Sequence, residues 1–171
     1  MQDLALNPWV ENSLPLATFV ICFLSGLILF VNAELFLLAI SPLVLTPEKV
    51  LLIGSLAALG QVLAKVLYYF AASRAMDLKF VKKKFSPEKI AHWHEKVERW
   101  GWRVPFVTLA SAFFGFPPYM ILSFVLGVTR ANFWMFFTTG MLGRGARFII
   151  IVGAPNFTFK FGHFIKEFFQ F

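Results

Sequence analysis

The sequence predicts an all-α integral membrane protein, built as an inverted repeat of two re-entrant helical hairpins that are each followed by one transmembrane helix. Of its 171 residues, 58% are hydrophobic and only 15% are charged, whereas about 25% are charged in soluble domains. Residues 12–33 and 104–129 contain no charge over 22 and 26 positions, the length of a membrane span. Asn32-Ala33-Glu34 and Phe116-Pro117-Pro118 interrupt the apolar sequence, as broken helices do in re-entrant hairpins.

The chain is expected to form one membrane domain, since 171 residues leave no room for a separate soluble one. Repeat 1 is expected over about 14–73 and repeat 2 over about 104–153. An amphipathic cytoplasmic linker is expected over 74–103, and an interfacial tail over 154–171. The alternative interpretation, a soluble protein with wholly apolar core helices, is disfavoured by the length of the charge-free runs.

The first repeat begins with two apolar half-helices, 14–31 and 35–45. Thr46-Pro47-Glu48 then has the features of a helix start, namely an N-cap residue, a proline in the first turn and an acid beside it. The helix that starts there is predicted to reach about residue 73. Its small residues suit close packing against other helices.

The linker 74–103 carries nine Lys or Arg residues and four acids. Ser86-Pro87-Glu88 again predicts a helix start, and four apolar residues follow at spacings of three and four, which predicts an amphipathic interfacial helix. His92 and His94 are two positions apart and face different sides of such a helix, so no metal site is expected. The apolar positions are Ile90, Trp93, Val97 and Trp100.

The second repeat has the same order, a broken apolar hairpin at 104–129 followed by a span at 133–153. Locally, 59–65 matches 142–147 with one gap. If each hairpin returns to its own side, the two spans run in opposite directions, which is the arrangement of inverted-repeat transporters. The alternative of six full spans leaves several spans too short.

The positive charges predict the orientation, because Lys and Arg concentrate on the cytoplasmic side of membrane proteins. The linker 74–103 and Arg130 are therefore expected inside, with both termini outside. The net charge of +7 lies mostly in this one segment, which argues against a nucleic-acid partner.

Four ionisable residues lie in apolar surroundings and form the candidate substrate and proton site. A guanidinium can bind a phosphate through two parallel hydrogen bonds, and Glu34 is the candidate proton carrier. The alternative is an internal salt bridge of Glu34 with Arg147 or Lys65. The candidate site residues are Glu34, Lys65, Arg144 and Arg147, with Asn32, Tyr68, Pro117 and Pro118 in supporting positions.

Over roughly 27–154 the sequence resembles the DedA superfamily, also called the VTT or SNARE-associated Golgi family, and most closely its small YqaA-like bacterial branch. It departs from the larger members in lacking their Arg-x-Pro-x-x-Arg pattern at the second hairpin and their paired prolines before the first acid. The residues that carry the resemblance are Glu34, Gly60, Tyr68, Ser73-Arg74-Ala75, Pro117 or Pro118, Gly127, Gly143, Arg144 and Arg147.

The resemblance implies lipid translocation in a bacterial inner membrane, on phospholipids or polyprenyl phosphate and coupled to protons. No enzyme activity, cofactor or metal is implied. Our hypothesis is that Arg147, helped by Arg144, holds a lipid phosphate while Glu34 carries the coupling proton. A non-transporting membrane scaffold or assembly factor and an ion or small-solute transporter remain as alternatives.

Overall fold

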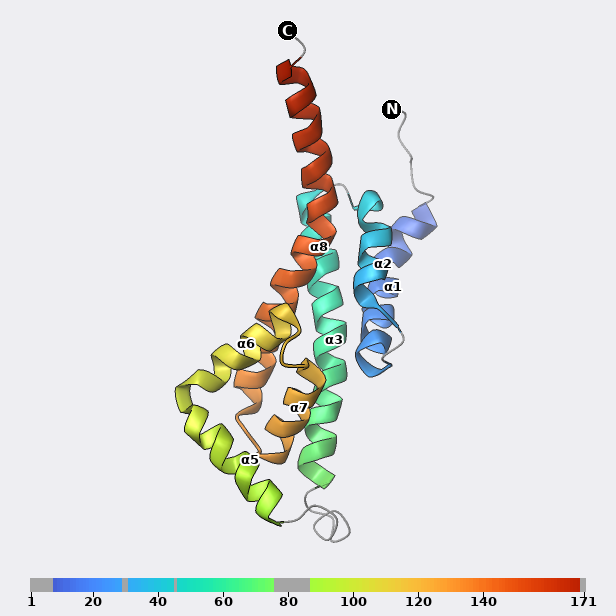
Figure 1. The fold of residues 1–171 in the computed structure, drawn as a ribbon. Helices are drawn as coiled ribbons and strands as arrows, with labels where there is room; N and C mark the ends of the chain where they lie inside the picture. Colours follow the sequence, from blue (N-terminus) through green and yellow to red (C-terminus); the bar gives the residue numbers. More distant parts are fainter. Residues whose placement is uncertain (1–7, 29–30, 45, 76–86, 170–171) are drawn as a thin grey trace. The chain divides into compact units, whose positions relative to one another are not determined.

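The computed structural model describes residues 8–28, 31–44, 46–75 and 87–169 (Figure 1). Every regular element within these ranges is helical, as the sequence predicts. The α-helices are α1 (Pro8–Leu27), α2 (Ala33–Ile40), α3 (Pro47–Ala75), α5 (Pro87–Trp100), α6 (Val104–Phe114), α7 (Tyr119–Val128) and α8 (Phe133–Phe169), and the 3₁₀ turns are η1 (Ser41–Leu43) and η2 (Gly101–Arg103).

The chain divides into two compact units. Unit 1 comprises Met1–Gln61 and Gly145–Phe171, and unit 2 comprises Val62–Arg144. Helices α3 and α8 therefore each contribute one part to each unit. The other helices belong wholly to one unit, with α1 and α2 in unit 1 and α5, α6 and α7 in unit 2.

Two helices are long and apolar enough to cross a membrane, namely α3 with 29 residues and the segment Phe133–Pro155 of α8 with 23. Both begin where the sequence predicts. The Thr46 hydroxyl accepts a hydrogen bond from the Lys49 amide at 3.4 Å at the start of α3. The Asn132 side chain accepts one from the Met135 amide at 3.1 Å at the start of α8.

In unit 1, α1 and α2 form the first hairpin (Figure 1). The prediction that Asn32-Ala33-Glu34 interrupts the helices is wrong in its placement, because α1 ends at Leu27 and α2 already begins at Ala33. The Asn32 side-chain oxygen accepts hydrogen bonds from the Glu34 and Leu35 amides at 2.9 and 3.3 Å. Asn32 is thus the N-cap of α2, and Glu34 lies within its first turn.

Gly60 brings α3 against the backbone of α1 in unit 1. A Cβ atom added to it would lie 2.6 Å from the Phe19 carbonyl oxygen and 3.0 Å from the Phe23 nitrogen. One residue further on, the buried Gln61 amide donates to the Ser25 hydroxyl at 2.6 Å. A backbone contact and a polar bond therefore fix α1 at the same level of α3.

In unit 2, α6 and α7 form the second hairpin around the expected proline pair. Gly115 ends α6 in the left-handed conformation, with φ of 80°, which glycine adopts without steric cost. The Ser111 hydroxyl donates to the Pro117 carbonyl at 2.5 Å. The Phe116-Pro117 peptide bond is cis.

Gly143 brings α8 against α6 in unit 2. A Cβ atom added there would lie 2.8 Å from the Leu109 carbonyl oxygen, 2.7 Å from the Ala112 Cβ atom and 3.2 Å from the Phe113 nitrogen. The contact has the form of the Gly60 contact in unit 1. In both units, a glycine of a long helix meets a carbonyl oxygen and the amide nitrogen four residues later on the first helix of a hairpin.

The end of α7 packs against α3 through Tyr69. The Tyr69 hydroxyl donates to the Ala131 carbonyl at 2.5 Å, and its ring stacks on Phe136 at 5.3 Å. Gly127 lies against the Tyr69 carbonyl, where a Cβ atom would not fit. Arg130 adopts φ of 51°, a conformation that glycine usually provides at a helix end.

Of the two expected interfacial helices, α5 begins at Pro87 as the sequence predicts, whereas the tail differs from its prediction. In α5, Val97 and Trp100 pack against the core of unit 2, while the side chains of Ile90, Trp93 and His94 and the linker residues 76–86 lie outside the described part. The tail was expected as a separate helix from residue 154. It is instead continuous with α8, which passes through Pro155 and ends at Phe169. The tail side chains beyond Pro155 are not described.

Candidate functional site

Glu34 and Arg147 form an ion pair within unit 1. The Arg147 guanidinium nitrogen lies 2.5 Å from the Glu34 carboxylate oxygen, with side-chain exposures of 23% and 37%. The α2 N-terminus favours an acid in its first turn because the aligned peptide dipoles leave partial positive charge there. Asn32 caps this turn. Asn32, which was predicted as a supporting residue, therefore positions the carboxylate of Glu34, which was predicted as a site residue.

Lys65 lies in the C-terminal part of α3, which belongs to unit 2. Only 7% of its surface is exposed, and its ammonium lies 5.1 Å from the ring centroid of Tyr68. The aromatic face carries partial negative charge and stabilises the cation. Tyr68 was predicted as a supporting hydrogen-bond donor, and the structure shows that its ring faces the Lys65 ammonium.

Arg144 also lies in unit 2 and is close enough to Lys65 for their charges to repel. Its guanidinium carbon lies 5.5 Å from the ring centroid of Tyr119. Tyr119 is the first residue of α7, directly after Pro117 and Pro118, so the proline pair positions the aromatic face on which Arg144 rests.

The Tyr119 hydroxyl is buried beside Gly140, which leaves space for it because it has no Cβ atom. Tyr119 is 3% exposed. Within the described residues of the chain, its hydroxyl oxygen has no hydrogen-bond partner. A buried polar group without a partner costs about 1–3 kcal/mol of stability. Packing in the protein interior therefore does not explain why this position has a tyrosine and not a phenylalanine.

The predicted site residues therefore occur as two pairs. Glu34 and Arg147 belong to unit 1, and Lys65 and Arg144 belong to unit 2. The salt bridge between Glu34 and Arg147 was one of the two alternatives that the sequence left open. Sequence reasoning missed Tyr119, although its position immediately after a proline pair in an apolar hairpin was a usable signal.

Comparison of the chain with protein-family models, with curated proteins and with solved structures gives no match. The resemblance to the DedA superfamily therefore remains a proposal. In the described part of the chain, no group of three or more His, Cys, Asp or Glu residues is placed to hold a metal ion. The chemistry that the arrangement offers is that of cations and a phenol in apolar surroundings, which suits an oxyanion.

Proposed function

We propose that the chain is an integral membrane protein that translocates phospholipids or polyprenyl phosphate, and that Arg144, Lys65 and Tyr119 receive the lipid phosphate. The proposal includes the DedA-like inverted repeat, the bacterial inner membrane and the cytoplasmic position of 74–103. The observation that carries it is the buried Tyr119 hydroxyl, which has no partner among the described residues and belongs to a ring that the Arg144 guanidinium faces.

The exposed apolar side chains support a membrane environment. The spans α3 and α8 expose Leu51, Leu67, Leu142 and Ile150 by 51–67%. Large apolar side chains are also exposed on α2 of the first hairpin and on α7 of the second. A water-soluble protein rarely exposes large contiguous apolar patches, whereas lipid tails solvate such side chains at no cost.

The composition of the two units supports an inverted repeat. Each unit combines one hairpin with the first part of one long helix and the last part of the other. The glycine contacts agree, since Gly60 meets α1 in unit 1 and Gly143 meets α6 in unit 2. Their sequence contexts, Leu-Gly-Gln and Leu-Gly-Arg, are the local match found in the sequence.

The α3–α8 contacts within each unit also agree with the repeat. In unit 1, Gly54 meets Ile149 and Gly153 meets Val50. In unit 2, the Phe70 and Phe133 rings lie 5.3 Å apart. A repeat that aligns Gly60 of α3 with Gly143 of α8 also aligns Val50 with Phe133 and Phe70 with Gly153. The Val50–Gly153 contact of unit 1 therefore corresponds to the Phe70–Phe133 contact of unit 2.

The Tyr119→Phe variant tests the phosphate site. Removing a hydroxyl that has no protein partner should leave the thermal stability unchanged or higher. Flip-flop of labelled phosphatidylethanolamine and of a polyprenyl phosphate probe in liposomes should fall about tenfold or more, the value of one hydrogen bond to a charged group. Arg144→Gln should slow flip-flop at least as much.

Arg99→Gln is the matched control, because Arg99 is exposed and pairs with the neighbouring Glu95 on the surface of α5. It should transport at the wild-type rate. A Tyr119→Phe protein that folds and transports like the wild type would contradict the phosphate site. A wild-type protein that is folded but moves neither probe would contradict translocation as a whole.

The second candidate is a membrane scaffold without transport, and the Glu34–Arg147 ion pair favours it. An ion pair between α2 and α8 links a hairpin of unit 1 to a span. In that case the site variants should change protein abundance in the membrane with no effect on flux.

A further inference from the structure

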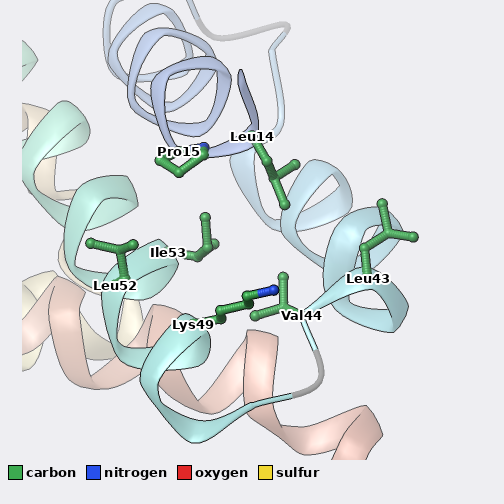
Figure 2. Close-up of a pocket in the computed structure, with 7 residues that line it drawn as sticks. All are labelled: Leu14, Pro15, Leu43, Val44, Lys49, Leu52 and Ile53. Carbon is green, nitrogen blue, oxygen red and sulfur yellow. The ribbon is translucent and has the colours of Figure 1, made fainter. Parts of the chain in front are cut away.

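Unit 1 contains a cavity of about 120 Å³ at the start of α3. Its size is close to that of a cavity that accommodates one benzene molecule, so it has room for a short segment of an acyl chain. The walls come from α1, from η1 with the residue after it, and from α3. The apolar residues that line it are Leu14, Pro15, Leu43, Val44, Leu52 and Ile53 (Figure 2).

Lys49 adds a cation to this otherwise apolar lining. Figure 2 shows its side chain crossing the cavity with the amino group directed toward Val44 on the opposite wall. A hollow with hydrocarbon walls and one ammonium group complements a molecule that has both an apolar chain and a negative charge. Neither a purely apolar ligand nor a free inorganic anion would use both features.

The position along α3 agrees with a lipid ligand. Lys49 follows Pro47, the first residue of the span, by two positions. A lysine at the end of a transmembrane helix extends its ammonium to the headgroup level. The cavity extends from Lys49 to Ile53, which is one helical turn deeper and therefore at the level of the first acyl carbons.

We propose that this cavity, lined by Leu14, Pro15, Leu43, Val44, Lys49, Leu52 and Ile53, binds an anionic phospholipid of the bilayer. Lys49 pairs with the phosphate and the apolar walls enclose the beginning of one acyl chain. The proposal rests on the membrane insertion proposed above. With 74–103 in the cytoplasm, it places the lipid in the outer leaflet. The lining residues belong to unit 1, whereas Arg144 and Tyr119 belong to unit 2.

The test uses the full chain in vesicles that contain phosphatidylglycerol with a photoactivatable group on one acyl chain, and compares it with the same probe on phosphatidylcholine. Cross-linked peptides are mapped by mass spectrometry. We expect labelling of the cavity residues about fivefold stronger for phosphatidylglycerol, the contribution of one lysine at a membrane surface. Lys49→Gln should abolish this preference, whereas Lys49→Arg should retain it.

Leu52→Trp and Leu51→Trp form a matched pair, because both leucines are about half exposed on α3 but only Leu52 lines the cavity. Leu52→Trp should reduce cavity labelling by both probes, and Leu51→Trp should not. Inserted protein that still translocates lipid but labels equally with both probes would overturn the cavity proposal alone. If an alkaline carbonate wash releases the protein from the vesicles, the result would overturn membrane insertion and the cavity proposal together.

Discussion

Gly143→Ala is expected to destabilise the protein by about 1–3 kcal/mol, the cost of overpacking a close contact. Its new Cβ atom would lie 2.7 Å from the Ala112 Cβ atom and 2.8 Å from the Leu109 carbonyl oxygen, and a backbone oxygen cannot move aside as a side-chain end can. Alanine favours an isolated helix by about 1 kcal/mol over glycine, which is smaller than the cost of the clash.

Gly145→Ala is the matched control, two residues along the same helix. A Cβ atom added there meets nothing within 4 Å, so the propensity gain should dominate and stabilise the protein by up to about 1 kcal/mol. Unfolding in a detergent or bicelle titration measures both variants. Equal effects of the two substitutions would contradict the close packing of α8 against α6.

Glu34→Gln and Arg147→Gln are each expected to destabilise the protein, and the double variant should regain most of the loss. A water-exposed ion pair contributes about 0–1 kcal/mol, whereas removing one partner of a buried pair costs about 3–5 kcal/mol because a charge remains in a low-dielectric medium. The side chains are 23% and 37% exposed in the protein alone. If lipid surrounds the exposed part of the two side chains, each single substitution should lower the free energy of unfolding by an amount closer to about 3–5 kcal/mol than to about 0–1 kcal/mol.

A double-mutant cycle on unfolding free energies measures the coupling between the two residues. A coupling of about 2 kcal/mol or more would support a pair surrounded by lipid and protein. A coupling below about 0.5 kcal/mol would indicate a water-exposed pair and argue against the membrane environment. In the flux assay, Glu34→Gln should also remove the response to a pH gradient if Glu34 carries the coupling proton.

Local signals in the sequence account for the correct parts of the prediction. Thr46, Pro47 and Asn132 set the starts of α3 and α8 through caps that involve only neighbouring residues. The Phe116-Pro117-Pro118 interruption likewise lies in the turn between α6 and α7. Capping and proline effects act within one turn of helix, so sequence alone reveals them.

Tertiary contacts account for the parts that the sequence left open or placed wrongly. Whether Glu34 pairs with Arg147 or Lys65 depends on which helix faces α2, and the bonded Arg147 is 113 positions away. The burial of the Tyr119 hydroxyl depends on Gly140 of another helix. The tail was expected to form a separate interfacial helix, yet α8 continues into it through Pro155, a residue type that usually ends a helix.

Cysteine accessibility tests most directly the claim that α3 crosses a membrane with 74–103 on the cytoplasmic side. The chain has one native cysteine, Cys22, which is buried and can be replaced by alanine. Glu48→Cys and Glu98→Cys then place single thiols at two exposed glutamates, one at the start of α3 and one in α5. In intact bacterial cells, a membrane-impermeant maleimide should label Glu48→Cys at once and Glu98→Cys only after permeabilisation. Labelling of both positions to the same extent in intact cells, or of Glu98→Cys alone, would contradict the account.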